Sequence, residues 1–177
     1  MSFTTKFYIA DSHFSHESVI RHCQRPFADS AEMDEAMVVR WNERVRPGDM
    51  VFHLGDFSLA DVDRTREIFG QLNGRKYLIT GNHDLDNRGR LHKRLRDLEW
   101  AAPPVAAMET SDSGQRVYLC HYAARVWPAS HHGSWHFYGH SHGRMPPLGR
   151  SRDVGVDLPD VDFSPRTFAE LTANLEV

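Results

Sequence analysis

The sequence predicts an α/β fold, and three observations indicate it. Short apolar runs alternate with stretches of helical periodicity in the first half of the chain, and strand-like runs dominate the second half. The composition, 40% hydrophobic and 25% charged, is that of an ordinary globular protein. A length of 177 residues is typical of one domain, so we expect a single domain over 1–177 with room for two sheets.

The first half should contain three strands and two helices. Apolar residues run together in each strand, and a polar cluster follows it. In the first of the helices, Met37, Trp41 and Val45 recur every four residues and form one apolar face. The expected strands are 6–10, 50–54 and 76–80, and the expected helices are 31–45 and 61–72.

The second half reads differently, because strands dominate it after one basic helix. Leu91, Leu95 and Leu98 share a face of that helix. Near the end, Ser164 and Pro165 have the residue types of a helix N-cap and first turn, which predicts a last helix through Leu175. The basic helix is expected at 90–98 and the strands at 116–121, 134–140 and 153–158.

Charge and cysteine content exclude several classes of protein. A net charge of −3 gives no support for a nucleic-acid or anionic-membrane surface. The two cysteines cannot form a disulfide framework, which favours a reducing compartment. No apolar run approaches the ~18 residues of a membrane span, and the run before Asp11 is too short for a signal peptide. We therefore expect a cytoplasmic protein that does not bind membranes.

Polar clusters of Asp, Asn and His follow the expected strands. In an open α/β sheet, ligands bind beyond the carboxyl ends of the strands, so these positions carry extra weight. Each cluster alone has an ordinary explanation as turn or surface chemistry, but their order along successive strands does not. The clusters are Asp11-x-His13, Gly55-Asp56, Gly81-Asn82-His83-Asp84, His121 and Gly139-His140-Ser-His142.

This set of side chains predicts a site for two metal ions. Mixed nitrogen and oxygen donors suit Mn²⁺, Fe or Zn²⁺ better than Ca²⁺ or a soft ion. There are more donors than one tetrahedral metal needs, and a carboxylate can bridge two ions. Two divalent ions would leave an excess of positive charge, which attracts phosphate and lowers the pKa of a bound water. The residues thus indicate a two-metal hydrolase of phosphate esters.

The same ordered set resembles the calcineurin-like metallophosphoesterase family. The stretches Asp11-Ser-His-Phe-Ser-His-Glu-Ser-Val-Ile20 and Arg25-Pro-Phe27 resemble its small single-domain bacterial and phage-type members. The resemblance implies a four-layered fold, in which two mixed β-sheets pack as a sandwich flanked by helices. It also implies two divalent ions, with Mn²⁺ preferred and Fe, Zn²⁺, Ni²⁺ or Mg²⁺ as alternatives.

The resemblance assigns a role to each motif. The first metal would be held by Asp11, His13 and His142, with Asp56 as the bridge, and the second would be completed by Asn82, His121 and His140. His83 would be the catalytic histidine beside the phosphate, and Asp84 would orient or charge its imidazole. The implied mechanism is in-line attack by a metal-bound hydroxide without a covalent intermediate.

Four further residues are candidates for contact with the substrate: His16, Arg88, Arg125 and Arg144. A structural hydrogen bond is the alternative for His16, and a solvated helix face is the alternative for the basic run 88–96. His53 is expected in the core or behind the ligands, and His131, His132 and His136 are expected at the surface.

The expected function is hydrolysis of a small phosphate ester, with phosphodiesters preferred over monoesters. A phosphomonoesterase acting on a small metabolite or nucleotide is one alternative, and a non-catalytic metal-binding scaffold on the same fold is another. A nuclease is disfavoured by the net charge of −3, although a local basic patch would permit it. The oligomeric state stays open.

Overall fold

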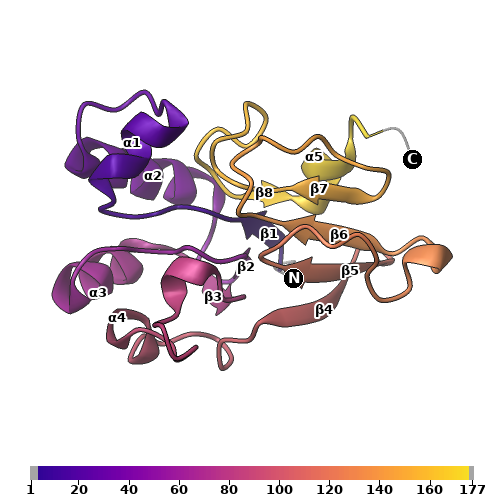
Figure 1. Cartoon of the computed structure of the whole chain (residues 1–177), viewed down its shortest axis with the longest axis horizontal. Coiled ribbons are helices and arrows are strands. Elements are labelled where there is room, and N and C mark those ends of the chain that lie inside the picture. Colours follow the sequence, from indigo (N-terminus) through magenta and orange to yellow (C-terminus); the bar gives the residue numbers. More distant parts are fainter. Residues whose placement is uncertain (1–3, 176–177) are drawn as a thin grey trace.

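Two mixed four-stranded sheets pack face to face in the computed structural model, which describes residues 4–175 (Figure 1). In the first sheet β1 (Lys6–Ile9), β2 (Met50–His53) and β3 (Arg75–Leu78) are parallel, and β8 (Arg166–Thr167) runs antiparallel to β1. In the second sheet β5 (Gln115–Cys120), β6 (Trp135–Tyr138) and β7 (Ser151–Asp153) are parallel, and β4 (Ala107–Asp112) is antiparallel to β5. The predicted fold class is confirmed.

Helices cover the first sheet on the side away from the second (Figure 1). They are α1 (Glu17–Cys23), α2 (Ser30–Arg44), α3 (Val62–Gln71) and the short α4 (Lys93–Arg96). Trp41 of α2 and Ile68 of α3 lie in one core with Ile9 of β1, because successive strand residues face opposite sides of a sheet. Within residues 4–175, no helix is long and apolar enough to cross a bilayer.

A second core fills the space between the sheets. Tyr8 is fully buried there, stacks on Phe52 with ring centroids 5.5 Å apart, and meets Phe137 of the other sheet edge-on at 5.1 Å. Its hydroxyl donates to Asp112 Oδ2 at 2.8 Å, so the buried ring has a polar partner. Helix α5 (Phe168–Thr172) closes one end of this core through Phe168, whose ring is 5.5 Å from that of Trp135.

The outer face of the second sheet is covered by the segment 122–134, which contains the short helix η2 (Ser130–His132). This segment forms the fourth layer. His136 lies beneath it and is fully buried, so the expectation of a surface histidine is wrong. The ring accepts a hydrogen bond from the Ala124 N–H at 3.0 Å and lies 5.4 Å from the Trp127 ring.

Several predicted boundaries differ from the structure. The last helix begins at Phe168, because Thr167 and Glu170 form its capping box, while Ser164 and Pro165 precede strand β8. Helix α1 was not predicted, since its N-cap residue, His16, makes no side-chain capping bond. Edge strand β4 was also missed, because it has no buried residue and therefore no apolar run. The strand expected at 153–158 ends at Asp153 as β7.

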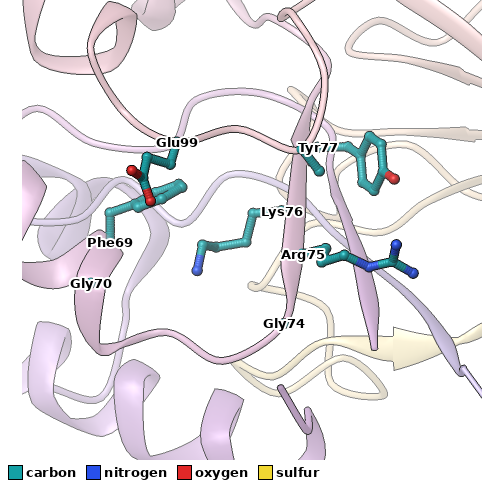
Figure 2. Close-up of a pocket in the computed structure, with 8 residues that line it drawn as sticks. Phe69, Gly70, Gly74, Arg75, Lys76, Tyr77 and Glu99 are labelled. Carbon is teal, nitrogen blue, oxygen red and sulfur yellow. The ribbon is translucent and has the colours of Figure 1, made fainter. Parts of the chain in front are cut away.

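One buried cation lies under α3, at the amino end of β3. Figure 2 shows the Lys76 ammonium group directed away from Arg75 and Tyr77, which lie on the other face of the strand. Lys76 lines a cavity of about 430 Å³. Its Nζ donates to the Leu72 carbonyl at 2.6 Å and lies 4.3 Å from the centroid of the Phe69 ring. Burial lowers the pKa of Lys76 to about 8.

Replacing Lys76 by methionine should stabilise the fold near neutral pH. Between pH 8 and 10.5 the unfolded chain holds the Lys76 proton and the folded chain releases it, so the wild type gains stability as pH rises through this window. Lys76→Met should therefore raise the free energy of unfolding by about 1 to 3 kcal/mol at pH 7 and by much less at pH 10. Urea denaturation at both pH values measures this. Lys93→Met, at an exposed lysine of α4, is the control, and a pH-independent difference for Lys76→Met would contradict the burial argument.

Candidate metal centre

The predicted ligand residues follow the ends of five strands, as the sequence pattern required. Five of them have a left-handed backbone, with φ of 58° at Asp11, 50° at His13, 57° at Asp56, 67° at His140 and 48° at His142. Residues other than glycine rarely adopt this conformation, and such strain concentrates at functional sites. The backbone bends sharply at these positions, so that each side chain turns into one shared region.

Two donor sets lie next to each other in this region. Asp11, His13 and His142 offer ligand atoms that all lie within 4.8 Å of one another, and so do Asp56, His121 and His140. Asp56 stands between the sets, because its Oδ2 is 3.5 Å from His13 Nε2 and 3.6 Å from His121 Nε2. Asn82 Oδ1 is 3.1 Å from the same His121 nitrogen. The structure thus brings together all seven residues that the sequence suggested as ligands.

The chemistry of these donors fits divalent cations. His13 Nε2 is buried and has no hydrogen-bond partner within residues 4–175. Burial, followed by the nearby charge of Arg25, lowers the pKa of His13 well below its usual range, so the ring is a neutral donor. Burial also raises the pKa of Asp11 and of Asp56. An unpaired buried nitrogen beside buried carboxylates is costly unless a cation satisfies them.

Two of the histidines are oriented through their second ring nitrogen. His121 Nδ1 lies 2.7 Å from the Leu54 carbonyl oxygen, which accepts a hydrogen bond from the Nδ1–H group. The other ring nitrogen, Nε2, is therefore directed at Asp56. Burial lowers the pKa of His121 to about 4. His142 Nδ1 lies 2.7 Å from Asp157 Oδ2. Burial alone would lower the pKa of His142, but hydrogen bonds to Asp157 and Cys23 and nearby negative charges raise it to about 10.

Glycines allow the backbone to approach the carboxylates closely. A Cβ atom on Gly81 would lie 2.3 Å from Asp56 Oδ1, and one on Gly139 would lie 2.9 Å from Asp11 Oδ2. A Cβ on Gly155 would meet the same Asp11 oxygen at 2.8 Å. The glycines that precede the ligands in the sequence motifs therefore provide space for the ligand carboxylates.

Asp84 has a different role from the expected one. Its carboxylate is buried and accepts hydrogen bonds from the backbone N–H groups of Gly81 at 2.8 Å, Asp56 at 2.8 Å and Phe57 at 3.0 Å. Burial, opposed by these hydrogen bonds, raises the pKa of Asp84 to about 6. Within residues 4–175 it makes no hydrogen bond to the His83 ring, so the expected contact is wrong. Asp84 instead ties the loop after β2 to η1 (Asn82–Asp84).

His83 lies at the edge of the two donor sets. Its ring centroid is 5.2 Å from that of His13, and its Nδ1 or Nε2 lies within 4.8 Å of ligand atoms of His13 and Asp56. The backbone is fixed on both sides: its N–H donates to Asp56 Oδ1 at 2.8 Å, and its carbonyl accepts from Arg94 Nη2 at 2.7 Å. The side chain is therefore held beside the shared carboxylate.

His16 supports a proposed ligand, which favours the structural alternative over substrate contact. Its Nδ1 lies 3.2 Å from His13 Nδ1 and its Nε2 lies 2.7 Å from Ser18 Oγ, so both ring nitrogens have partners. Within residues 4–175, none of the other three candidates makes a side-chain hydrogen bond to a donor residue. Arg144 donates to the His22 carbonyl at 3.0 Å, while Arg88 and Arg125 are exposed and have no side-chain hydrogen bond within the described chain.

Sequence reasoning missed three charged residues behind the donors. Asp153 accepts from the backbone N–H groups of Gly143 and Gly155, and so fixes the loops next to His142 and Asp11. Asp157 contacts His142, and Arg25 contacts Asp157. Asp153 and Asp157 lie in a stretch that resembled a strand, and Arg25 was noted only within Arg25-Pro-Phe27, a motif to which no role was assigned.

The fold and these donors define an α/β protein of two mixed sheets with possible metal-binding His/Asp clusters at the strand ends. The chain is 31% identical over 174 residues to the uncharacterized protein MJ1445 of Methanocaldococcus jannaschii, covering 93% of this chain and 88% of that protein. It belongs to the same family as MJ1445. No family model matches the chain.

A solved structure shares the fold. AQ665 from Aquifex aeolicus, a protein of unknown function, superposes with a TM-score of 0.71 at 20% identity over 98% of this chain and 100% of its own. YfcE, a phosphoesterase from E. coli, gives a TM-score of 0.42 at 16% identity over 86% of this chain and 78% of its own. The likeness to AQ665 shows the fold alone.

Proposed function

We propose that this protein is a metal-dependent phosphoesterase that uses two divalent ions. One observation carries the proposal: Asp56 Oδ2 stands between His13 and His121, at 3.5 and 3.6 Å, where one carboxylate can serve two donor sets. The resemblance to calcineurin-like metallophosphoesterases supports the choice of a phosphate ester as substrate. When bound, two such ions would supply positive charge for the phosphate and would activate water for attack.

The candidate ligands would be divided between the two ions. Asp11, His13 and His142 hold the first ion, Asp56 is shared, and Asn82, His121 and His140 complete the second. Asp84 and the glycines position Asp56. The second set is open to solvent, since His140 and Tyr122 are exposed. An exposed second set is compatible with a second organic group on the phosphate, as in the phosphodiester that we propose as the preferred substrate.

His83 is the proposed proton donor to the leaving oxygen. It lies beside the shared carboxylate, and its backbone is held by Asp56 and Arg94, so the ring stays near a phosphate bound at the two ions. General acid catalysis contributes most when the leaving group is a poor one, because a poor leaving group needs the proton in the transition state.

Purification followed by chelation and metal addition tests the proposed function. We expect two Mn²⁺ per chain, loss of hydrolysis after chelation, and recovery with Mn²⁺ in preference to Fe²⁺, Zn²⁺, Ni²⁺ or Mg²⁺. The substrates should include bis(p-nitrophenyl) phosphate, p-nitrophenyl phosphate and dinucleotides. Metal binding without hydrolysis of any ester would support a scaffold instead, and preference for the monoester would overturn the diester assignment.

Replacing His83 by glutamine should separate catalysis from metal binding. We expect kcat to fall about 10²- to 10⁴-fold on a diester with an alkyl leaving group, and to fall less with p-nitrophenolate as the leaving group. Bound metal should stay at two ions per chain. His131→Gln, at an exposed histidine of η2, is the control. If the His83→Gln protein bound only one ion per chain, His83 would be a ligand. This is geometrically possible, because ligand atoms of His13, Asp56 and His83 also lie within 4.8 Å of one another.

A further inference from the structure

A buried ion pair lies directly behind the first donor set. Arg25 Nε donates to Asp157 Oδ1 at 2.8 Å and Nη2 donates to Asp157 Oδ2 at 2.9 Å. The Arg25 side chain is 0% exposed and the Asp157 side chain is 5% exposed. Removing two charges from water is expensive, so such a pair is poor evidence of stabilisation and suggests another role.

Each partner of this pair also contacts the first donor set. On one side, Arg25 Nη1 donates to the Ser12 carbonyl at 2.8 Å and Nη2 donates to the Asp11 carbonyl at 2.7 Å. These carbonyls belong to the sharp backbone turn between Asp11 and His13. On the other side, Asp157 Oδ2 lies 2.7 Å from His142 Nδ1. The pair therefore connects the loop after β1 with the loop after β6.

The carboxylate also decides which nitrogen of His142 is free. An ionised carboxylate only accepts hydrogen bonds, so Asp157 keeps a proton on His142 Nδ1, and Nε2 is the nitrogen that offers a lone pair once a metal displaces the other ring proton. Cys23 Sγ lies 3.3 Å from the same Nδ1 and is a weaker partner. Asp157 thus determines which ring nitrogen of His142, a member of the first donor set, can bind a metal.

We propose that Arg25 and Asp157 are positioning residues for the first metal: together they fix His142 as an Nε2 donor and hold the Asp11–His13 loop against it. This inference rests on the proposed function, because it requires that the first donor set binds a metal. Neither Arg25 nor Asp157 would contact the metal or the substrate itself.

Asp157→Asn tests the inference with a change of one atom. Three N–H groups face the carboxylate, Arg25 Nε on one oxygen and Arg25 Nη2 and His142 Nδ1 on the other, and an amide with one acceptor oxygen and one NH₂ group cannot accept from all three. The variant therefore loses either part of the Arg25 pair or the hydrogen bond that fixes the His142 ring, and it removes the negative charge beside that ring. We expect the affinity of one of the two Mn²⁺ ions to fall about 10- to 100-fold while the other ion binds as in the wild type. Electron paramagnetic resonance of free Mn²⁺ measures both affinities in a titration of the metal-free protein.

Two further variants guard against a simple loss of structure. Asp160→Asn is the matched control, since Asp160 is in the same loop and pairs with Arg152 at 2.9 Å in the same way, but is half exposed. Asp160→Asn should leave both affinities unchanged. If Asp157→Asn does not fold, the double variant R25Q/D157N removes both buried charges and leaves none unpaired. It should show the same selective loss of one ion.

A double-mutant cycle decides whether the effect passes through His142. Asp157→Asn should weaken Mn²⁺ binding in the wild type and have a much smaller effect in a His142→Ala background, where only the contact with the Asp11–His13 loop is left to lose. Equal effects in both backgrounds, or unchanged affinities in Asp157→Asn, would overturn the inference. If the wild type itself binds no Mn²⁺, the proposed function fails instead, so the two failures are distinguishable.

Discussion

Asp56→Asn is expected to remove hydrolysis almost completely. Within residues 4–175, Asp56 is the one carboxylate that has an oxygen within 4 Å of a histidine of each donor set, and an amide has a single neutral oxygen with which to replace two charged ones. Two-ion catalysis stabilises the transition state by several kcal/mol, so we expect kcat/KM to fall at least about 10³-fold. Bound Mn²⁺ should fall from two ions per chain to one or none, as measured by metal analysis after gel filtration.

The control for this variant is Asp63→Asn. Asp63 is an exposed aspartate of α3 that pairs with Arg66 on the surface, so its loss should leave activity and metal content unchanged. The fold of Asp56→Asn should be intact, since burial raises the pKa of Asp56 and a neutral amide costs less to bury than a charge. Retention of two ions and of wild-type turnover would remove Asp56 from the site.

Gly81→Ala is expected to disrupt the site through one methyl group. Gly81 has φ of −94°, which alanine tolerates, so the effect isolates the lack of space. The new Cβ would lie 2.3 Å from Asp56 Oδ1 and 2.7 Å from the Asp56 backbone nitrogen, neither of which can move without shifting the ligand. We expect a loss of about 1 to 3 kcal/mol in the free energy of unfolding and a loss of metal binding.

Gly70→Ala provides the matched comparison. Gly70 lies inside α3, and a Cβ there meets no atom within 4 Å. Alanine has the higher helix propensity, so this variant should be stabilised by about 0.5 to 1 kcal/mol and should bind metal normally. Denaturation curves and Mn²⁺ titrations of the two variants give the comparison. A Gly81→Ala protein with wild-type Mn²⁺ affinity would show that the Asp56 carboxylate is not confined as the structure indicates.

The fold class and the candidate ligands could be predicted from sequence because both depend on local patterns. A buried strand such as β2 is a largely apolar run, and Asp56 follows shortly after its last residue, His53. Residues that follow parallel strands meet at one edge of the sheet, so order along the chain implies proximity in space. This is why Asp11 and Asp56 could be grouped before the structure was known, whereas His142 follows β6 of the other sheet and was grouped with Asp11 by the family resemblance.

The partners of those donors could not be predicted, because they depend on contacts between distant loops. Nothing near Asp84 in the sequence indicates that its carboxylate accepts from the Phe57 N–H instead of the His83 ring. The Arg25–Asp157 pair joins residues 132 positions apart. His136 was misassigned because it was grouped with the nearby His131 and His132, although it lies in strand β6 between Trp135 and Phe137, and the covering segment 122–134 explains its burial.

The left-handed backbone at five candidate ligands has a consequence for how the protein binds metal. Each such conformation costs of order 1 kcal/mol in a residue other than glycine, so the ligand loops work against the stability of the fold. That cost is borne during folding, before any ion arrives. Binding then needs little loop ordering, because the conformational entropy that a flexible site would lose on binding an ion has already been lost during folding. The site is preorganised, and its rigidity is a property of the metal-free chain.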